Sequence, residues 1–483
     1  MELSENPNFY HQYSSISRAI GSYHCPRGHK GSDEERISLY QQLEQFLSEQ
    51  AILSMSVQPI NWFAVDGTPV QRAYACKLED RSFVHHHEPT PGKKPLCVGH
   101  QYSCVALLPQ ELERWALPLS FRRIPTSSSP AEFGIQQWIN LIKSPDSPFH
   151  HTVCGLTADS QYLNAQNIHK LAAQENTFFI ARLRQNRVLY RPESEEERKG
   201  KGRGRPRWYQ KSPLRLKDTT LWSSPDQEVT LPWTMLKNKP CVVRIAQFSN
   251  LRLKGRHGCP IYNVPISLLK VTVEDLNHQS LYPSPLWLTV IKSSSQELPL
   301  ETYWKVYKKR YDIEHFFRFG KNRLLIDRFQ TPDTRHEENW IYLVIASYHL
   351  LYHCRPVAGF YPHRWERKHP TSSNLSPRQV QRDMSHLLKA FPHGYPIPRG
   401  NPKGRLLKSS LLPREDHVIY CKSFYSCLPF KRLAINVTFG KDCSVPKVQI
   451  NSKGNIKPLN RSQIRQFKTH LLQYFVLQQR LNC

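Results

Sequence analysis

Short apolar runs alternate with amphipathic segments along most of the chain, and charged or turn-forming residues end each run. Such runs predict β-strands, because a buried strand is short and bounded by turn residues. They lie at residues 61–65, 82–86, 100–108, 149–157 and 178–183. Apolar residues at helical spacing predict helices instead, at residues 33–53, 131–142, 160–171 and 338–354. The mixture predicts an α/β protein, with the Pro-rich stretch 118–130 as a connection.

A further helix is predicted downstream of these elements. Ser376-Pro377-Arg378-Gln379 forms a capping box with proline at the first helical position, and the helix should run to about residue 390.

One predicted helix carries an unusual mixture of side chains. At about 100° per residue, Tyr307, Arg310, Glu314 and Lys321 fall within one stripe about 60° wide. The opposite side is apolar and predicts a core face made of Val306, Ile313, Phe316, Phe317 and Phe319. A carboxylate between cations can hold a divalent metal beside a polyanion. A solvated helix face with ordinary ion pairs remains the alternative.

Two aspartates follow predicted strands. Asp66 ends the apolar run that starts at Asn61 and is followed by Gly67-Thr68-Pro69, which predicts a turn. Asp159 ends the later run in the same way, just before a predicted helix. Both carboxylates are therefore placed at strand ends, although Asp66 could serve the turn and Asp159 could cap the helix.

The spacing Tyr307-x2-Arg310-x3-Glu314-x6-Lys321, with an aromatic pair two residues after the Glu, resembles the YREK signature of DDE transposases from bacterial insertion sequences. The resemblance extends from about Leu53 to Arg405. It implies an RNase H-like catalytic core, a mixed sheet flanked by helices, with a β-rich insertion subdomain before the last catalytic helix. It also implies three catalytic, metal-binding carboxylates, which are Asp66, Asp159 and Glu314.

The resemblance implies cofactors and partners as well. The carboxylates would hold two Mg²⁺ ions, for which Mn²⁺ can substitute, and the partner would be double-stranded DNA at element ends and target sites. By resemblance Tyr307, Arg310 and Lys321 contact phosphates, and Arg318 lies beside them. A dimer is expected when the protein is bound to DNA.

The gap between Asp159 and Glu314 indicates the insertion. Residues 186–293 are rich in strand-forming residues and predict the β-rich subdomain, while residues 54–185 and 294–355 form the catalytic core. Residues 1–53 are predicted to be a short polar lead that could be a reduced DNA-binding region. Residues 356–422 form a basic region of helix and loop, and residues 423–483 an appended tail of unassigned role.

A basic, glycine-rich loop lies inside the insertion. Arg203-Gly204-Arg205-Pro206 copies the core of an AT-hook, which places two arginines in a narrow minor groove. We expect Arg203 and Arg205 to bind DNA, as contacts to phosphate or as readers of A·T sequence.

Charge supports a polyanionic partner. The chain of 483 residues has a formal net charge of +28, and 39% of its residues are hydrophobic, so it has folded domains as well as a basic surface. Its twelve cysteines include no C-x-x-C pair, and no segment is long and apolar enough to span a membrane. A cytoplasmic, nucleoid-associated protein of a bacterium is expected.

These observations predict a DNA transposase that cuts element ends and transfers the strands, as in cut-and-paste transposition. Two alternatives stay open at this point. One is an RNase H-fold nuclease that cuts DNA without joining it. The other is a decayed copy that binds DNA without catalysis.

Overall fold

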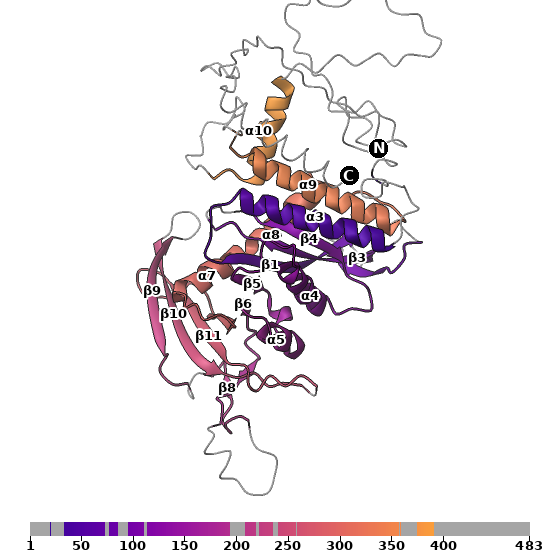
Figure 1. The fold of residues 1–483 in the computed structure, drawn as a ribbon. Coiled ribbons are helices and arrows are strands. Elements are labelled where there is room, and N and C mark those ends of the chain that lie inside the picture. The colour runs from indigo at the N-terminus through magenta and orange to yellow at the C-terminus, as the bar shows by residue number, and fades with distance from the viewer. Residues whose placement is uncertain are drawn as a thin grey trace, which may run out of the picture. The chain divides into compact units, whose positions relative to one another are not determined.

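A computed structural model describes the chain over residues 20, 33–72, 77–85, 95–110, 114–193, 208–218, 222–234, 240–256, 258–356, 358 and 374–390. The chain divides into two compact units. The first is Leu47–Pro332 and contains the sheet (Figure 1). The second combines Met1–Phe46 with Asp333–Cys483. The predictions for residues 391–483, including the appended tail, lie outside the described residues.

The first unit is built on a ten-stranded mixed sheet in the order β2-β3-β1-β5-β6-β12-β11-β10-β9, with β4 also paired to β3. The strands are β1 (Asn61–Gln71), β2 (Ser82–His85), β3 (Leu96–Leu107), β4 (Leu117–Arg123), β5 (Cys154–Ala158), β6 (Thr177–Arg182), β9 (Gln227–Thr234), β10 (Pro240–Leu251), β11 (Ile266–Glu274) and β12 (Leu286–Lys292). β1, β5 and β6 are parallel, whereas β3 and β12 run antiparallel to their neighbours. The predicted α/β fold, with a mixed sheet flanked by helices, is confirmed.

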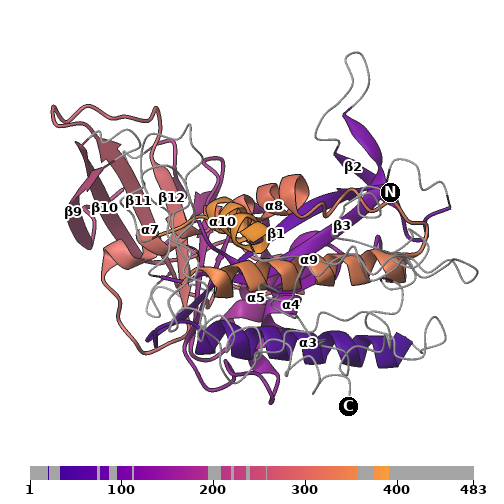
Figure 2. The same cartoon turned by 90° about the horizontal axis from the view of Figure 1, so that it is seen from above.

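Helices cover both faces of the sheet beside β1 (Figure 2). Alternate side chains of a strand point to opposite faces. Phe63 lies against Trp138 of α4 (Pro130–Lys143), with ring centroids 6.4 Å apart. Asp66 instead faces α7 (Leu300–Lys309) and α8 (Tyr311–Arg323), where it meets Arg310. Because both faces are covered, the run from Trp62 to Val65 is buried throughout.

The connection predicted at residues 118–130 is wrong, because β4 occupies its first part. Pro118 cannot donate a ladder hydrogen bond, but it lies where the pairing of β3 with β4 shifts register between Val105 and Ala106. Such a bulge tolerates a proline, which is why the strand persists. The strand predicted from residue 149 also begins later, at Cys154, since the preceding residues form turns.

Residues 186–293 contain the predicted strands, and these extend the main sheet. β12 pairs antiparallel with β6, and β11, β10 and β9 follow in order. Only the short strands β7 (Val188–Leu189) and β8 (Leu214–Arg215) form a separate pair within the described residues. A subdomain with boundaries at residues 186 and 293 stays a prediction.

Gly155 of β5 is expected to be irreplaceable by alanine. A Cβ at this position would lie 2.2 Å from the ring of Trp62 on the adjacent strand, and that ring is held in the core. Gly155→Ala should therefore lower the free energy of unfolding by about 1–3 kcal/mol, the usual cost of overpacking. Denaturant melts would measure the loss.

Gly320→Ala is the matched control for Gly155→Ala. Its Cβ would meet Cδ1 of Ile326 at 2.6 Å, which is the far end of a flexible side chain. That contact can relax, and alanine also favours the helix. Equal destabilisation by the two substitutions would contradict the rigid-ring argument.

The second unit is helical in its described part. It contains the first residues of α3 (Asp33–Leu53), α9 (Thr334–Cys354) and α10 (Pro377–Ala390). Tyr40 of α3 stacks on Tyr342 of α9 with ring centroids 4.6 Å apart. The capping box is confirmed, since Ser376 N donates to Gln379 Oε1 over 2.8 Å. None of the helices that the structure describes has the length and apolar character needed to cross a membrane.

Candidate active site

Asp66 lies inside β1 and not at its end, so the predicted turn at Gly67-Thr68-Pro69 is wrong. β1 pairs with β3 as far as Gln71, whereas its parallel pairing with β5 stops at Ala64. Beyond Ala64, side chains and not any of the described strands contact the edge of β1 that would face β5. Asp66 Oδ1 accepts the Gly67 N–H over 2.8 Å.

Asp159 directly follows β5 on the neighbouring strand. It precedes a short 3-10 helix, η2 (Ser160–Tyr162), but makes no side-chain cap hydrogen bond to it. The helix predicted from Ser160 to Leu171 is thus broken, and α5 (Ala165–Ala172) starts separately with Asn164 as its cap. Capping does not explain the Asp159 carboxylate, which is half-buried.

Glu314 lies in the first turn of α8. The single helix predicted through Tyr307 and Lys321 is wrong, because α7 ends at Lys309 and α8 starts at Tyr311. Arg310 lies at the junction of the two helices. There the backbone hydrogen bonds span three residues instead of four: the Arg310 N–H donates to Tyr307 O, and the Ile313 N–H donates to Arg310 O. The predicted apolar face is nevertheless buried as expected.

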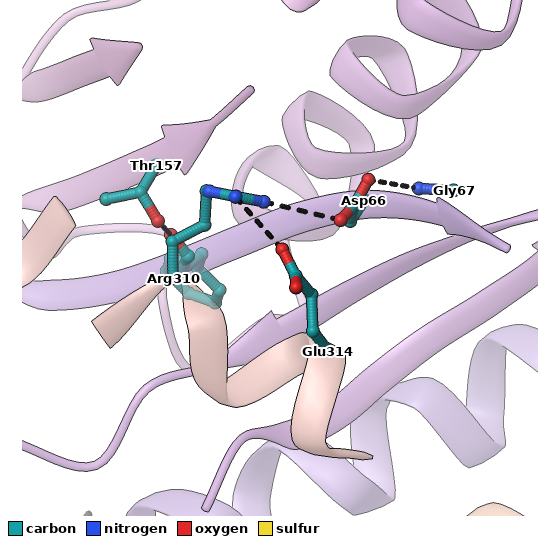
Figure 3. A network of polar contacts seen from close by, with 6 residues as sticks. Asp66, Gly67, Thr157, Arg310 and Glu314 are labelled. Carbon is teal, nitrogen blue, oxygen red and sulfur yellow. Dashed lines mark hydrogen bonds and ion pairs between the residues drawn. The ribbon is translucent and has the colours of Figure 1, made fainter. Parts of the chain in front are cut away.

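Arg310 brings two of the three carboxylates together (Figure 3). Its Nη1 lies 3.3 Å from Asp66 Oδ2, and its Nη2 lies 3.0 Å from Glu314 Oε1. The side chains of Arg310 and Asp66 are 6% and 18% exposed, so their ion pair is partly shielded from water, whereas the Glu314 side chain is 42% exposed. Nearby, Thr157 Oγ1 donates to Phe63 O over 3.0 Å and fastens β5 to β1 just before Asp66.

The electrostatics of Asp66 show that the three acids share one environment. Burial raises the pKa of the Asp66 carboxyl to about 6, while Arg310 and the Gly67 N–H act to lower it. Glu314 and Asp159 both raise it further, so both lie within electrostatic reach. Asp66, Asp159 and Glu314 therefore lie in one region, and their role as metal ligands stays a prediction.

The donor chemistry of this region fits a divalent metal. Carboxylate oxygens are the ligands that Mg²⁺ prefers, and Arg310 already places a cation between two of them. In the described residues no three acidic, histidine or cysteine side chains are close enough to hold an ion as they stand. The guanidinium takes up the space between Asp66 and Glu314.

The other predicted site residues are placed differently. Tyr307 and Lys321 are buried, and Lys321 Nζ donates to Pro69 O over 2.8 Å. Burial lowers the pKa of the Lys321 ammonium to about 8 and raises that of Tyr307 to about 12. Arg318 is exposed on α8. Their contacts with DNA stay predictions, and Arg203 and Arg205 lie outside the described residues.

Sequence reasoning missed two buried residues that support Asp159. Tyr162 is 1% exposed, and the carboxylates of Asp66 and Asp159 are among the groups that raise its pKa, after burial. Asn167 is fully buried, and its Nδ2 donates to Tyr162 O over 2.9 Å and to Ala131 O over 3.2 Å. An asparagine in an amphipathic helix gave no signal, because its partners are backbone carbonyls, one of them 36 residues away in α4.

Arg114 was also missed. Its backbone is left-handed, with φ 66°, and its N–H donates to Asp312 Oδ1 over 3.1 Å. This contact fixes the exposed Arg114 at the start of α8. Burial, Arg318 and Arg114, in that order, lower the pKa of His315, so both arginines lie within electrostatic reach of this helix face.

A comparison with known protein families bears directly on this region. Residues 116–350 match the family model of the transposase DDE domain. The match includes Asp159, Arg310 and Glu314, whereas Asp66 precedes it. The search of curated proteins gave no match. DDE transposases generally use divalent metal ions and bind DNA, and residues 116–350 of this chain are similar to their DDE domain.

Proposed function

We propose that the protein is a transposase that cuts DNA at the ends of an insertion sequence and transfers the cut strands to a target. The observation that carries this proposal is the grouping of Asp66 with Asp159 and Glu314, the last two of which lie in the segment that matches the transposase DDE domain. We assign these three residues as the ligands of two Mg²⁺ ions. Bound metal ions would activate the attacking hydroxyl and stabilise the leaving 3′-oxygen.

The chain's own residues then bind and orient the DNA. Arg310 offers a planar fork suited to a phosphate, and the exposed Arg318 offers a second cation on α8, the helix that follows Arg310. Arg114 extends this set, because Asp312 holds its backbone at the start of α8. A net charge of +28 supplies the wider attraction for a polyanion. A dimer on DNA would bring two ends together.

Product analysis tests the proposed function. Purified protein is incubated with Mg²⁺ and a labelled duplex that carries the DNA flanking its gene, together with a target plasmid. Cleaved ends joined to the plasmid are the expected products. Cleaved ends without joining would indicate a nuclease, and DNA binding without cleavage would indicate a non-catalytic protein.

Arg114→Gln is expected to weaken DNA binding without regard to sequence. A phosphate contact contributes through counterion release, so its loss should reduce the slope of log K against log salt by about 1. Fluorescence anisotropy at several salt concentrations measures the slope. Lys143→Gln, at the exposed end of α4 on the opposite face of the sheet, is the control. An equal change in both variants would refute a specific contact at Arg114.

A further inference from the structure

Arg310 ties together two acids from different parts of the chain. Each terminal nitrogen of its guanidinium contacts a different carboxylate, Asp66 on β1 and Glu314 on α8 (Figure 3). Both contacts, at 3.3 Å and 3.0 Å, are hydrogen bonds as well as ion pairs. One side chain therefore sets the separation of two proposed metal ligands.

Charge balance explains why a cation is needed there. Glu314 and Asp159 both act against the ionised form of Asp66, and burial does so more strongly. Arg310 is the strongest of the groups that favour the ionised form of Asp66, and it contacts both Asp66 and Glu314 directly. Without a cation, neighbouring carboxylates would repel one another or take up protons. The positive charge of the guanidinium thus offsets the negative charge of the carboxylates, as a bound metal ion would.

The same side chain has an unmet bonding group. Arg310 Nε is buried and has no hydrogen-bond partner within the described residues. A buried donor without a partner costs free energy, so this arrangement does not satisfy the guanidinium fully. The ring of Tyr311 lies 4.9 Å from the guanidinium carbon and is 48% exposed. This ring would support the guanidinium in a position closer to solvent.

We propose that Arg310 is the counter-cation of the metal-free site, and that a divalent ion binds only when Arg310 releases Asp66 and Glu314. This inference rests on the proposed metal site. A phosphate of bound DNA is the chemistry that would draw the guanidinium away, because it accepts a bidentate fork and can satisfy Nε. DNA and metal would then bind with positive coupling, and the DNA-free protein would bind metal weakly.

Mn²⁺ binding to the full-length protein without DNA tests this inference. Isothermal titration at slightly alkaline pH compares wild type with Arg310→Met, which keeps bulk and removes the fork. The variant should bind Mn²⁺ about tenfold more tightly, a usual size for coupling between sites. Arg323→Met removes an exposed cation from the same helix and should leave Mn²⁺ affinity unchanged. Equal gains in both variants would overturn the inference in favour of a general charge effect.

A second substitution keeps the test decisive if Arg310→Met fails to fold, which circular dichroism would show. Arg310→Lys retains the charge but cannot contact both carboxylates at once. Its Mn²⁺ affinity should also exceed that of wild type, and an unchanged or weaker affinity would overturn the inference.

Glu314→Gln separates failure of this inference from failure of the proposed function. If no protein shows Mn²⁺ binding that depends on Glu314, the proposed metal site fails, and the inference fails with it. If binding depends on Glu314 but Arg310 variants gain no affinity, only the inference fails. A duplex carrying the DNA that flanks the gene should raise the Mn²⁺ affinity of wild type and leave that of Arg310→Met unchanged.

Discussion

Glu314→Gln is expected to slow DNA cleavage by about 10³-fold or more, because a metal-held carboxylate contributes several kcal/mol to the transition state. Glutamine keeps an oxygen that can accept from Arg310 Nη2, so the junction of α7 and α8 should persist. DNA affinity should stay within a few fold, since it depends on lysine and arginine contacts. Gel assays of Mg²⁺-dependent cleavage and anisotropy measurements of binding would report the two effects separately.

Glu301→Gln is the control for Glu314→Gln. Glu301 lies in the first turn of α7, so its substitution makes the same change in charge on the preceding helix. It should leave cleavage unchanged. Undiminished cleavage by Glu314→Gln would exclude Glu314 as a metal ligand. Loss of DNA binding together with a lowered melting temperature would indicate misfolding instead.

Asn167→Leu is expected to reduce both stability and cleavage. It removes the two hydrogen bonds from a fully buried amide to Ala131 O and Tyr162 O, at a cost of about 1 kcal/mol each. η2 then loses its attachment to α4, and Asp159 immediately precedes η2. A shift of the carboxylate by about 1 Å can lower a rate by about 100-fold. Denaturant melts and cleavage rates measure the two effects.

Asn164→Ala is the matched control for Asn167→Leu. Asn164 Oδ1 caps α5 by accepting the Asn167 N–H over 2.9 Å, and within the described residues its side chain makes no hydrogen bond to η2. Its loss should cost about 1 kcal/mol of stability and have a smaller effect on cleavage. If the cleavage rate falls in proportion to the lost free energy of unfolding in both variants, the role of Asn167 is to stabilise α5. Asn167 would then not position Asp159.

Local pattern was sufficient to predict the two strands that precede Asp66 and Asp159. The apolar run before Asp66 and the run before Asp159 both form buried strands, because burial on two faces leaves a continuous apolar signature. The capping box at Ser376 was also reliable, since both of its partners lie within one turn. Side-chain periodicity likewise identified the buried face of α8.

Long-range pairing decided what local pattern could not. Gly67-Thr68-Pro69 has the composition of a turn, but β3 offers this segment an antiparallel partner as far as Gln71. The helical stripe assumed one unbroken helix through Arg310, whereas the guanidinium is held by Asp66 from β1. Arg114 depends on Asp312, which lies on a distant helix. None of these partners is encoded within a short window of sequence.

The edge of β1 beside Asp66 has a consequence for self-association. An unpaired strand edge invites pairing with another chain. Among the described residues no strand pairs with this edge beyond Ala64, and side chains occupy some of its hydrogen-bonding groups. Asp66 Oδ1 accepts the Gly67 N–H, Pro69 has no N–H, and Lys321 Nζ donates to the Pro69 carbonyl. Loss of the Asp66 carboxylate is therefore expected to favour self-association at this edge, so light scattering should accompany every activity measurement on an Asp66 variant.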